Sequence, residues 1–107
     1  MKPGTLNLTV YQRATFRQSF DLGIDLSGYS VYAQVWDKAR RTKYTDFTVE
    51  FTNQAAGQFD LVLSYTVTTG LTKDAYWDLL IEEPSGERNY WLEGIVVIDP
   101  GYTAPGA

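Results

Sequence analysis

The chain alternates hydrophobic and polar residues in short runs, and turn residues separate these runs. Alternation with a period of two is typical of strands that bury one face and expose the other. It predicts strands at residues 6–11, 15–22, 29–36, 47–52, 59–63, 77–81 and 90–98. No window of helix length keeps a helical period. The pattern therefore predicts an all-β sandwich of seven to eight antiparallel strands.

The inward positions of these runs form the predicted core. They are Phe16, Phe20, Val31, Ala33, Val35, Val49, Phe51, Phe59, Leu61, Leu63, Trp77, Leu79 and Ile81. Gly94 interrupts the last apolar run, where we expect a bulge or a close approach of another segment. Residues 66–73 lack alternation and are predicted to form a loop with one helical turn.

The length of 107 residues indicates one domain, at residues 1–99, followed by a tail at residues 100–107 that is rich in proline and glycine. We expect this tail to be a loose terminus rather than an ordered docking arm. No signal peptide and no membrane-spanning run are visible, so synthesis in a cytoplasm is expected.

The chain contains neither histidine nor cysteine. It therefore lacks the commonest general base, the thiol nucleophile and the usual zinc ligands. Asp78 and Glu82 share one face of a strand, but nothing in the sequence marks a cleft between them, so solvated strand positions are the expected role. We predict no enzymatic activity, no cofactor and no metal. The net charge of −4 disfavours nucleic acid as a partner.

Large side chains on outward positions are the candidate binding residues. If Val31, Ala33 and Val35 face the core, Tyr32 and Trp36 must point outward, where aromatic residues anchor interfaces. The alternatives are that a neighbouring segment covers both side chains or that the register is inverted.

Two further candidates lie elsewhere in the chain. A basic cluster crowds the connection after Trp36, where it could steer an acidic partner or simply form a solvated hairpin tip; its members are Lys38, Arg40, Arg41 and Lys43. Trp91 lies on a final strand that is apolar on both faces, so it belongs either to an interface or to the interior of the domain.

Several short patterns occur in a fixed order. They are Thr15-Phe16 after the first strand, Asp25-Leu26-Ser27-Gly28-Tyr29, Gly57 followed by Leu61 and Leu63, Tyr76-Trp77-Asp78-Leu79, and Leu92-Glu93-Gly94 leading to Pro100. In this order the chain resembles a family of small phage and prophage virion proteins, related to the amino-terminal domain of phage baseplate upper proteins. Two positions depart from the pattern: Arg13-Ala14 replaces a glycine and an acidic residue, and Trp36 replaces a basic residue.

The resemblance implies an immunoglobulin-like β-sandwich that is a structural part of a phage particle. A tail, baseplate or fibre-attachment adaptor is expected, present in several copies or as a homo-oligomer. It would contact other tail or baseplate proteins and would reside in the virion after synthesis in the host cytoplasm. The alternative function is a carbohydrate-binding module, because exposed Tyr32 and Trp36 could stack on sugar rings.

Overall fold

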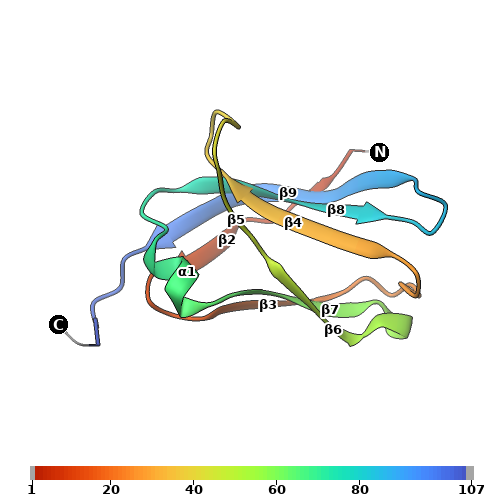
Figure 1. Ribbon diagram of the computed structural model, residues 1–107, viewed down its shortest axis with the longest axis horizontal. Helices are drawn as coiled ribbons and strands as arrows, with labels where there is room; N and C mark the ends of the chain where they lie inside the picture. Colours follow the sequence, from red (N-terminus) through yellow and green to blue (C-terminus); the bar gives the residue numbers. More distant parts are fainter. Residues whose placement is uncertain (1, 106–107) are drawn as a thin grey trace.

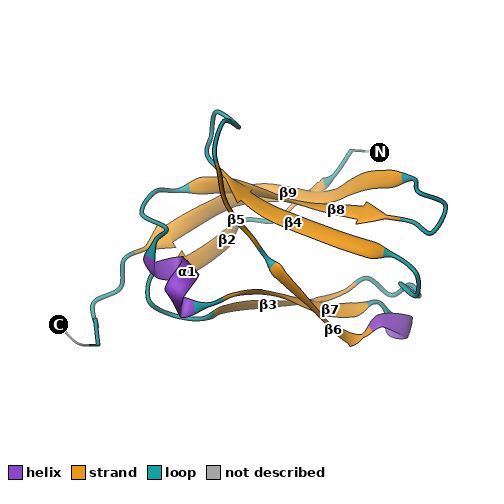
Figure 2. Ribbon diagram, in the orientation of Figure 1, coloured by secondary structure: helices purple, strands orange, loops and turns teal. Residues whose placement is uncertain are grey.

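Two β-sheets pack face to face in the computed structural model, which describes residues 2–105 (Figures 1 and 2). The larger sheet contains β1 (Gly4–Thr5), β2 (Leu8–Tyr11), β9 (Arg88–Asp99), β8 (Ala75–Glu82), β4 (Ser30–Trp36) and β5 (Lys43–Asp46). The smaller sheet contains β3 (Phe16–Asp21), β7 (Gln58–Leu63) and β6 (Thr48–Asn53). Two short helices, η1 (Gln54–Ala56) and α1 (Tyr65–Thr69), complete the elements. The predicted all-β sandwich is confirmed.

The strand order is that of an immunoglobulin-like sandwich. In that fold, strands B, E and D lie opposite strands G, F, C and C′. Here β3, β7 and β6 lie opposite β9, β8, β4 and β5, in the matching order. One departure from the expected antiparallel arrangement is that β1 and β2 run parallel to β9.

The chain crosses from the larger sheet to the smaller one between the end of β5 and the start of β6 (Figure 1). Phe47 lies at this crossing and is buried, and its N–H donates a hydrogen bond of 2.9 Å to the carbonyl of Ala33. Its ring contacts Phe16 and Trp77 at centroid distances of 5.9 and 6.0 Å. The crossing residue therefore ties the two sheets together inside the core.

Most of the predicted core is confirmed. The buried members are Val31, Ala33, Val35, Phe59, Leu61, Leu63, Trp77, Leu79 and Ile81. Phe16, Phe20 and Val49 are partly buried and pack against this cluster. The rings of Phe20 and Phe59 stack with centroids 5.3 Å apart, which fills the space between the sheets.

Phe51 is a correction to the predicted core, because 39% of its surface is exposed. β6 pairs only with β7, so it is an edge strand, and its register shifts between Phe51 and Asn53. The rings of Phe51 and Phe59 pack edge to face with their centroids 6.1 Å apart, and no strand pairs with the other edge of β6. Period-two alternation cannot distinguish an edge strand from a central one.

The predicted helical turn within residues 66–73 is confirmed by α1. The Ser64 hydroxyl caps this helix by accepting a hydrogen bond from the N–H of Val67. Thr68 donates a hydrogen bond of 2.8 Å from its hydroxyl to the carbonyl of Ala14, which pins the helix to the β2–β3 turn.

The tail after Asp99 contacts the β2–β3 turn. Arg13 donates hydrogen bonds to the carbonyls of Pro100 and Thr103. The tail is therefore held against the β2–β3 turn as far as Thr103, and residues 106–107 lie outside the described part of the chain.

Candidate functional site

The outer face of the smaller sheet is polar, and charged side chains on it form ion pairs with one another. Arg17 forms ion pairs with Asp60 and Glu50, at 2.8 and 3.0 Å. Hydrogen bonds from Ser19 and Arg17 lower the pKa of Asp60 below its usual value. The outer surface of β3, β7 and β6 also carries no large aromatic group that a partner could contact.

The outer face of the larger sheet is different, because strand register aligns side chains of β4, β8 and β9 in three rows. Tyr32, Leu80 and Tyr90 form one outer row, and Trp36, Tyr76 and Ile95 form the other. Gln34, Asp78 and Glu93 form the middle row. We call the apolar part of this surface the aromatic face, which consists of Tyr32, Trp36, Tyr76, Leu80, Tyr90, Ile95 and Val97.

The aromatic face is open to solvent. Tyr90 is 50% exposed, Tyr32 46% and Tyr76 41%. Residues on the same strands alternate with them and are buried, as Val31, Ala33 and Val35 are on β4. Tyr32 and Trp36 therefore lie on the outward side, as the alternation predicted.

Two carboxylates lie across from each other in the middle row. Burial raises the pKa of Asp78; the positive charge of Arg40 opposes this rise, and the negative charge of Glu93 adds to it. Neither Asp78 nor Glu93 has an ion-pair partner among residues 2–105. The middle row is therefore a negative stripe between two apolar rows.

A chain of hydrogen bonds fixes the position of Trp36. Its indole N–H donates a hydrogen bond of 2.9 Å to Gln34, whose side-chain amide donates one of 2.8 Å to Asp46. Lys43 pairs with the same carboxylate at 2.8 Å, and this contact is the main cause that lowers the pKa of Asp46. The partly buried tryptophan is held in place without any partner.

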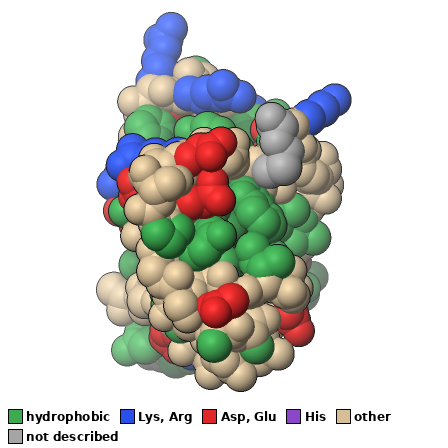
Figure 3. All heavy atoms as spheres, turned by 90° about the vertical axis from the view of Figure 1, so that its right-hand side faces the viewer, with side chains coloured by type: hydrophobic (Ala, Val, Ile, Leu, Met, Phe, Trp, Pro, Cys, Tyr) green, Lys and Arg blue, Asp and Glu red, His purple; other side chains and the backbone are tan. Residues whose placement is uncertain are grey.

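The predicted basic cluster lies at the tip of the β4–β5 hairpin, which rises above the sheets in Figure 1. Lys38, Arg40 and Arg41 are all exposed. The Asp37 carboxylate accepts hydrogen bonds from the N–H groups of Arg41 and Thr42, at 2.7 and 3.0 Å, so the tip has a defined turn. In Figure 3, lysine and arginine side chains stand along the corresponding upper edge.

Trp91 does not belong to the aromatic face. The β8–β9 register shifts between Leu79 and Leu80, where Leu79 pairs with Leu92 and Leu80 with Tyr90. Trp91 is the extra residue of this bulge, and its partly buried side chain packs against the core.

Sequence reasoning missed Tyr76, Leu80 and Tyr90. The signal was present, since Tyr76 and Leu80 alternate with buried Trp77 and Leu79 on β8. For Tyr90 the bulge breaks the alternation. The side of the sheet on which Tyr90 lies could therefore not be deduced by counting residues back from Val96.

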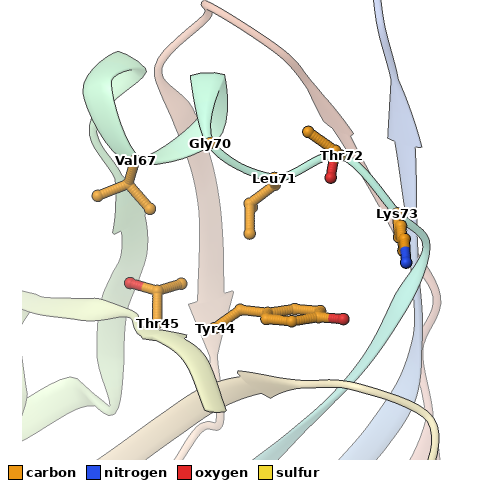
Figure 4. A pocket seen from close by; sticks show the side chains of 7 residues that line it. All are labelled: Tyr44, Thr45, Val67, Gly70, Leu71, Thr72 and Lys73. Carbon is orange, nitrogen blue, oxygen red and sulfur yellow. The ribbon is translucent and has the colours of Figure 1, made fainter. Parts of the chain in front are cut away.

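Two shallow hollows lie on the surface. One, of about 420 Å³, is bounded by β5 and the segment after α1, where Tyr44 faces Leu71 and Lys73 stands at one end (Figure 4). The other, of about 300 Å³, lies on the aromatic face; Tyr32 and Tyr90 line it together with Gln34, Asp78 and Arg88.

The described residues offer no other recognisable site. Within residues 2–105, no three acidic side chains gather as possible ligands of a metal ion. None of the helices in this part of the chain has the length and apolar character needed to span a membrane. Comparison of the chain with protein-family models and with curated proteins gives no match.

Proposed function

We propose that this protein is a non-enzymatic structural component of a phage particle, an adaptor in the tail, baseplate or fibre-attachment region. It acts through protein–protein contacts made by the aromatic face. The observation that carries the proposal is the contrast between the two outer faces, one polar and internally paired, the other aromatic and open. Leaving a large apolar side chain exposed forfeits about 1.5–3 kcal/mol of burial energy. A partner that covers the face recovers this energy.

The hydrogen-bonded Trp36 supports an interface. Aromatic side chains that are rigid before binding lose little conformational entropy when a partner covers them. Lys38, Arg40 and Arg41, which we call the basic tip, follow Trp36 closely in the chain. Charged groups at the rim of an interface accelerate association.

The resemblance to virion proteins supports the phage setting, since the glycine positions of its pattern have structural reasons here. A side chain on Gly57 or Gly94 would collide with the backbone of Ile24 or Leu6, respectively. Arg13 occupies a position where the family pattern has glycine. Its φ of 68° lies in the left-handed region, which glycine adopts most easily.

The proposal is tested in particles produced by the strain that encodes the protein. After induction, purified particles are analysed by mass spectrometry and by labelling with an antibody against the chain. We expect the protein in a fixed ratio to the tail proteins, and tail genes beside its own gene. Trp36→Ala should leave the fold intact and reduce incorporation. Particles that lack the protein would overturn the proposal.

A carbohydrate-binding module is the second candidate, and the hollow between Tyr32 and Tyr90 favours it. Leu80 lies between the two aromatic rings, which could stack on a sugar. Gln34, Asp78 and Arg88 line the same hollow and could bond the sugar hydroxyls. A glycan array with the wild type and Tyr32→Ala decides this question. Sugar binding by the wild type that Tyr32→Ala abolishes would support a carbohydrate-binding function. An array on which the wild type binds no glycan would exclude it.

A further inference from the structure

The aromatic face and the basic tip belong to one side of the molecule, because the tip continues from Trp36, the last residue of β4, which lies in an outward row of the face. The positive charge of Arg40 acts on Asp78, which lies in the middle row of the face. The chain therefore presents an apolar surface with a negative stripe at its centre and a positive tip at its rim. A two-fold axis that passes between the tip and the stripe would bring each positive tip onto the negative stripe of the other copy.

We propose that two copies of this chain pair through their aromatic faces about a two-fold axis, with the β4–β5 tip of each copy over the middle row of the other. This inference deepens the proposed function, because it names the first partner of the same face. In a two-fold interface one patch meets its own copy, so each favourable contact occurs twice.

The exposed area agrees with this occupant. A stable interface buries roughly 800 Å² on each partner. The three tyrosines of the face are about half exposed, and each presents on the order of 100 Å², given that a buried aromatic residue covers roughly 150–250 Å². The remainder of the roughly 800 Å² of interface area comes from the other side chains of the face and from the polar middle row. Those side chains are Trp36, Leu80, Ile95 and Val97.

Charge also agrees with a second copy. The middle row holds two carboxylates without an ion-pair partner in the described chain, Asp78 and Glu93. Lys38, Arg40 and Arg41 are exposed, and none of them has an ion pair within residues 2–105. The Asp37 turn fixes the backbone that carries Arg40 and Arg41, so less order must be gained on pairing.

The β5 edge of the larger sheet offers a weaker route to a dimer. β5 is an edge strand of four residues, and its Lys43–Asp46 ion pair and proximity to the basic tip discourage pairing with another strand. The face is therefore favoured over this edge as the surface through which two copies meet.

Sedimentation velocity over a range of concentrations tests the inference. We expect the full chain to reach twice its monomer mass of 12.1 kDa as its concentration rises. Tyr76→Ser should weaken the dimer at least tenfold. Tyr65→Ser is the matched control, because Tyr65 is 63% exposed but lies on α1, away from the face. Circular dichroism checks that both variants fold.

A charge exchange tests the geometry. The double variant Arg40→Glu with Arg41→Glu, and the variant Asp78→Lys, should each dimerise at least tenfold more weakly than the wild type. An equimolar mixture of the two should regain mixed dimers, because opposite charges then meet at both tips. Glu93→Lys replaces Asp78→Lys if the latter fails to fold, and Lys73→Glu controls for net charge.

The outcomes separate the inference from the proposed function. A wild type that stays monomeric at every concentration, or a dimer that resists both Tyr76→Ser and the charge reversal, overturns the inference. A monomer that is nevertheless found in particles leaves the proposed function standing with another partner. A dimer that has the expected sensitivities but is absent from particles supports the inference and removes the phage role.

Discussion

The indole N–H of Trp77 donates a hydrogen bond of 2.8 Å to the carbonyl oxygen of Leu6. Trp77 is buried on β8, and a buried indole needs an acceptor. Leu6 lies between β1 and β2, and its carbonyl can reach the indole because Gly94, opposite Trp77 in the β8–β9 ladder, has no side chain. A Cβ on Gly94 would collide with the Leu6 carbonyl. Gly94 and Trp77 therefore add to the parallel pairing of β1 and β2 with β9, which docks the amino-terminal segment.

Gly94→Ala should reduce the free energy of unfolding by about 2–4 kcal/mol. The new methyl group displaces the Leu6 carbonyl, and a buried donor without its partner costs about 1–3 kcal/mol before the loss of packing is added. Urea denaturation measures the change. Gly4→Ala is the matched control, because its Cβ would meet only ordinary contacts with Leu92 and Trp91. Equal midpoints for the two variants would contradict this docking.

Gly94 also shows how far the sequence could lead. A glycine within an apolar run predicted a close approach, and the structure confirms it. What approaches could not be predicted, because Leu6 is far from Gly94 in the sequence and parallel pairing of β2 with β9 leaves no turn signal between them. Local alternation determines which way a side chain points, and long-range pairing determines what it meets.

The same distinction explains the candidate site. Tyr32 and Trp36 were predicted to point outward because they alternate with Val31 and Val35. They do so because the β4–β8 pairing has no register shift up to Trp36. Trp91 could not be placed, because a bulge shifts its strand by one residue. Phe51 was misplaced because alternation does not reveal that β6 is an edge strand.

Phe59→Ala should destabilise the domain by about 3–5 kcal/mol, as truncation of a buried aromatic residue usually does. Phe59 is fully buried, and its ring contacts Phe20 and Phe51. Phe51→Ala is the control and should cost clearly less, because Phe51 is already partly solvated. Thermal and urea unfolding of both variants give the comparison. A larger loss for Phe51→Ala would place the centre of the core elsewhere.

Asp60→Asn should lower stability at neutral pH. Hydrogen bonds from Ser19 and Arg17 lower the pKa of Asp60 in the folded state. A carboxylate with a lowered pKa stabilises the fold above its unfolded pKa of about 3.9, and this stabilisation is lost as the pH falls through the folded pKa. Melting temperatures of wild type and variant should therefore differ at pH 7 and converge in strong acid. Curves that stay parallel throughout would exclude this role for Asp60.

Asp78→Asn should act in the opposite direction and raise stability at neutral pH. Burial raises the pKa of Asp78, so the folded state holds its proton more tightly than the unfolded state does. Stability from this group falls as the pH rises from about 3.9 through the folded pKa, and the neutral amide removes that loss. Melting curves at pH 3 and pH 7 measure the gain, which should be confined to the higher pH. A loss of stability at pH 7 would show that the carboxylate is needed inside the fold.

Arg13 combines a strained backbone with a useful side chain, and two substitutions separate these effects. Its φ of 68° is unfavourable for any residue with a Cβ, by about 1–2 kcal/mol, while its guanidinium bonds the carbonyls of Pro100 and Thr103. Arg13→Ala and Arg13→Gly should release the tail equally, measured as greater backbone mobility of residues 101–104 in NMR relaxation. The glycine variant should be more stable than the alanine variant by about 1 kcal/mol, because only glycine adopts this conformation without strain. Equal stability of the two variants would argue against the left-handed turn. A tail that is no more mobile in either variant would argue against the contact between Arg13 and the tail.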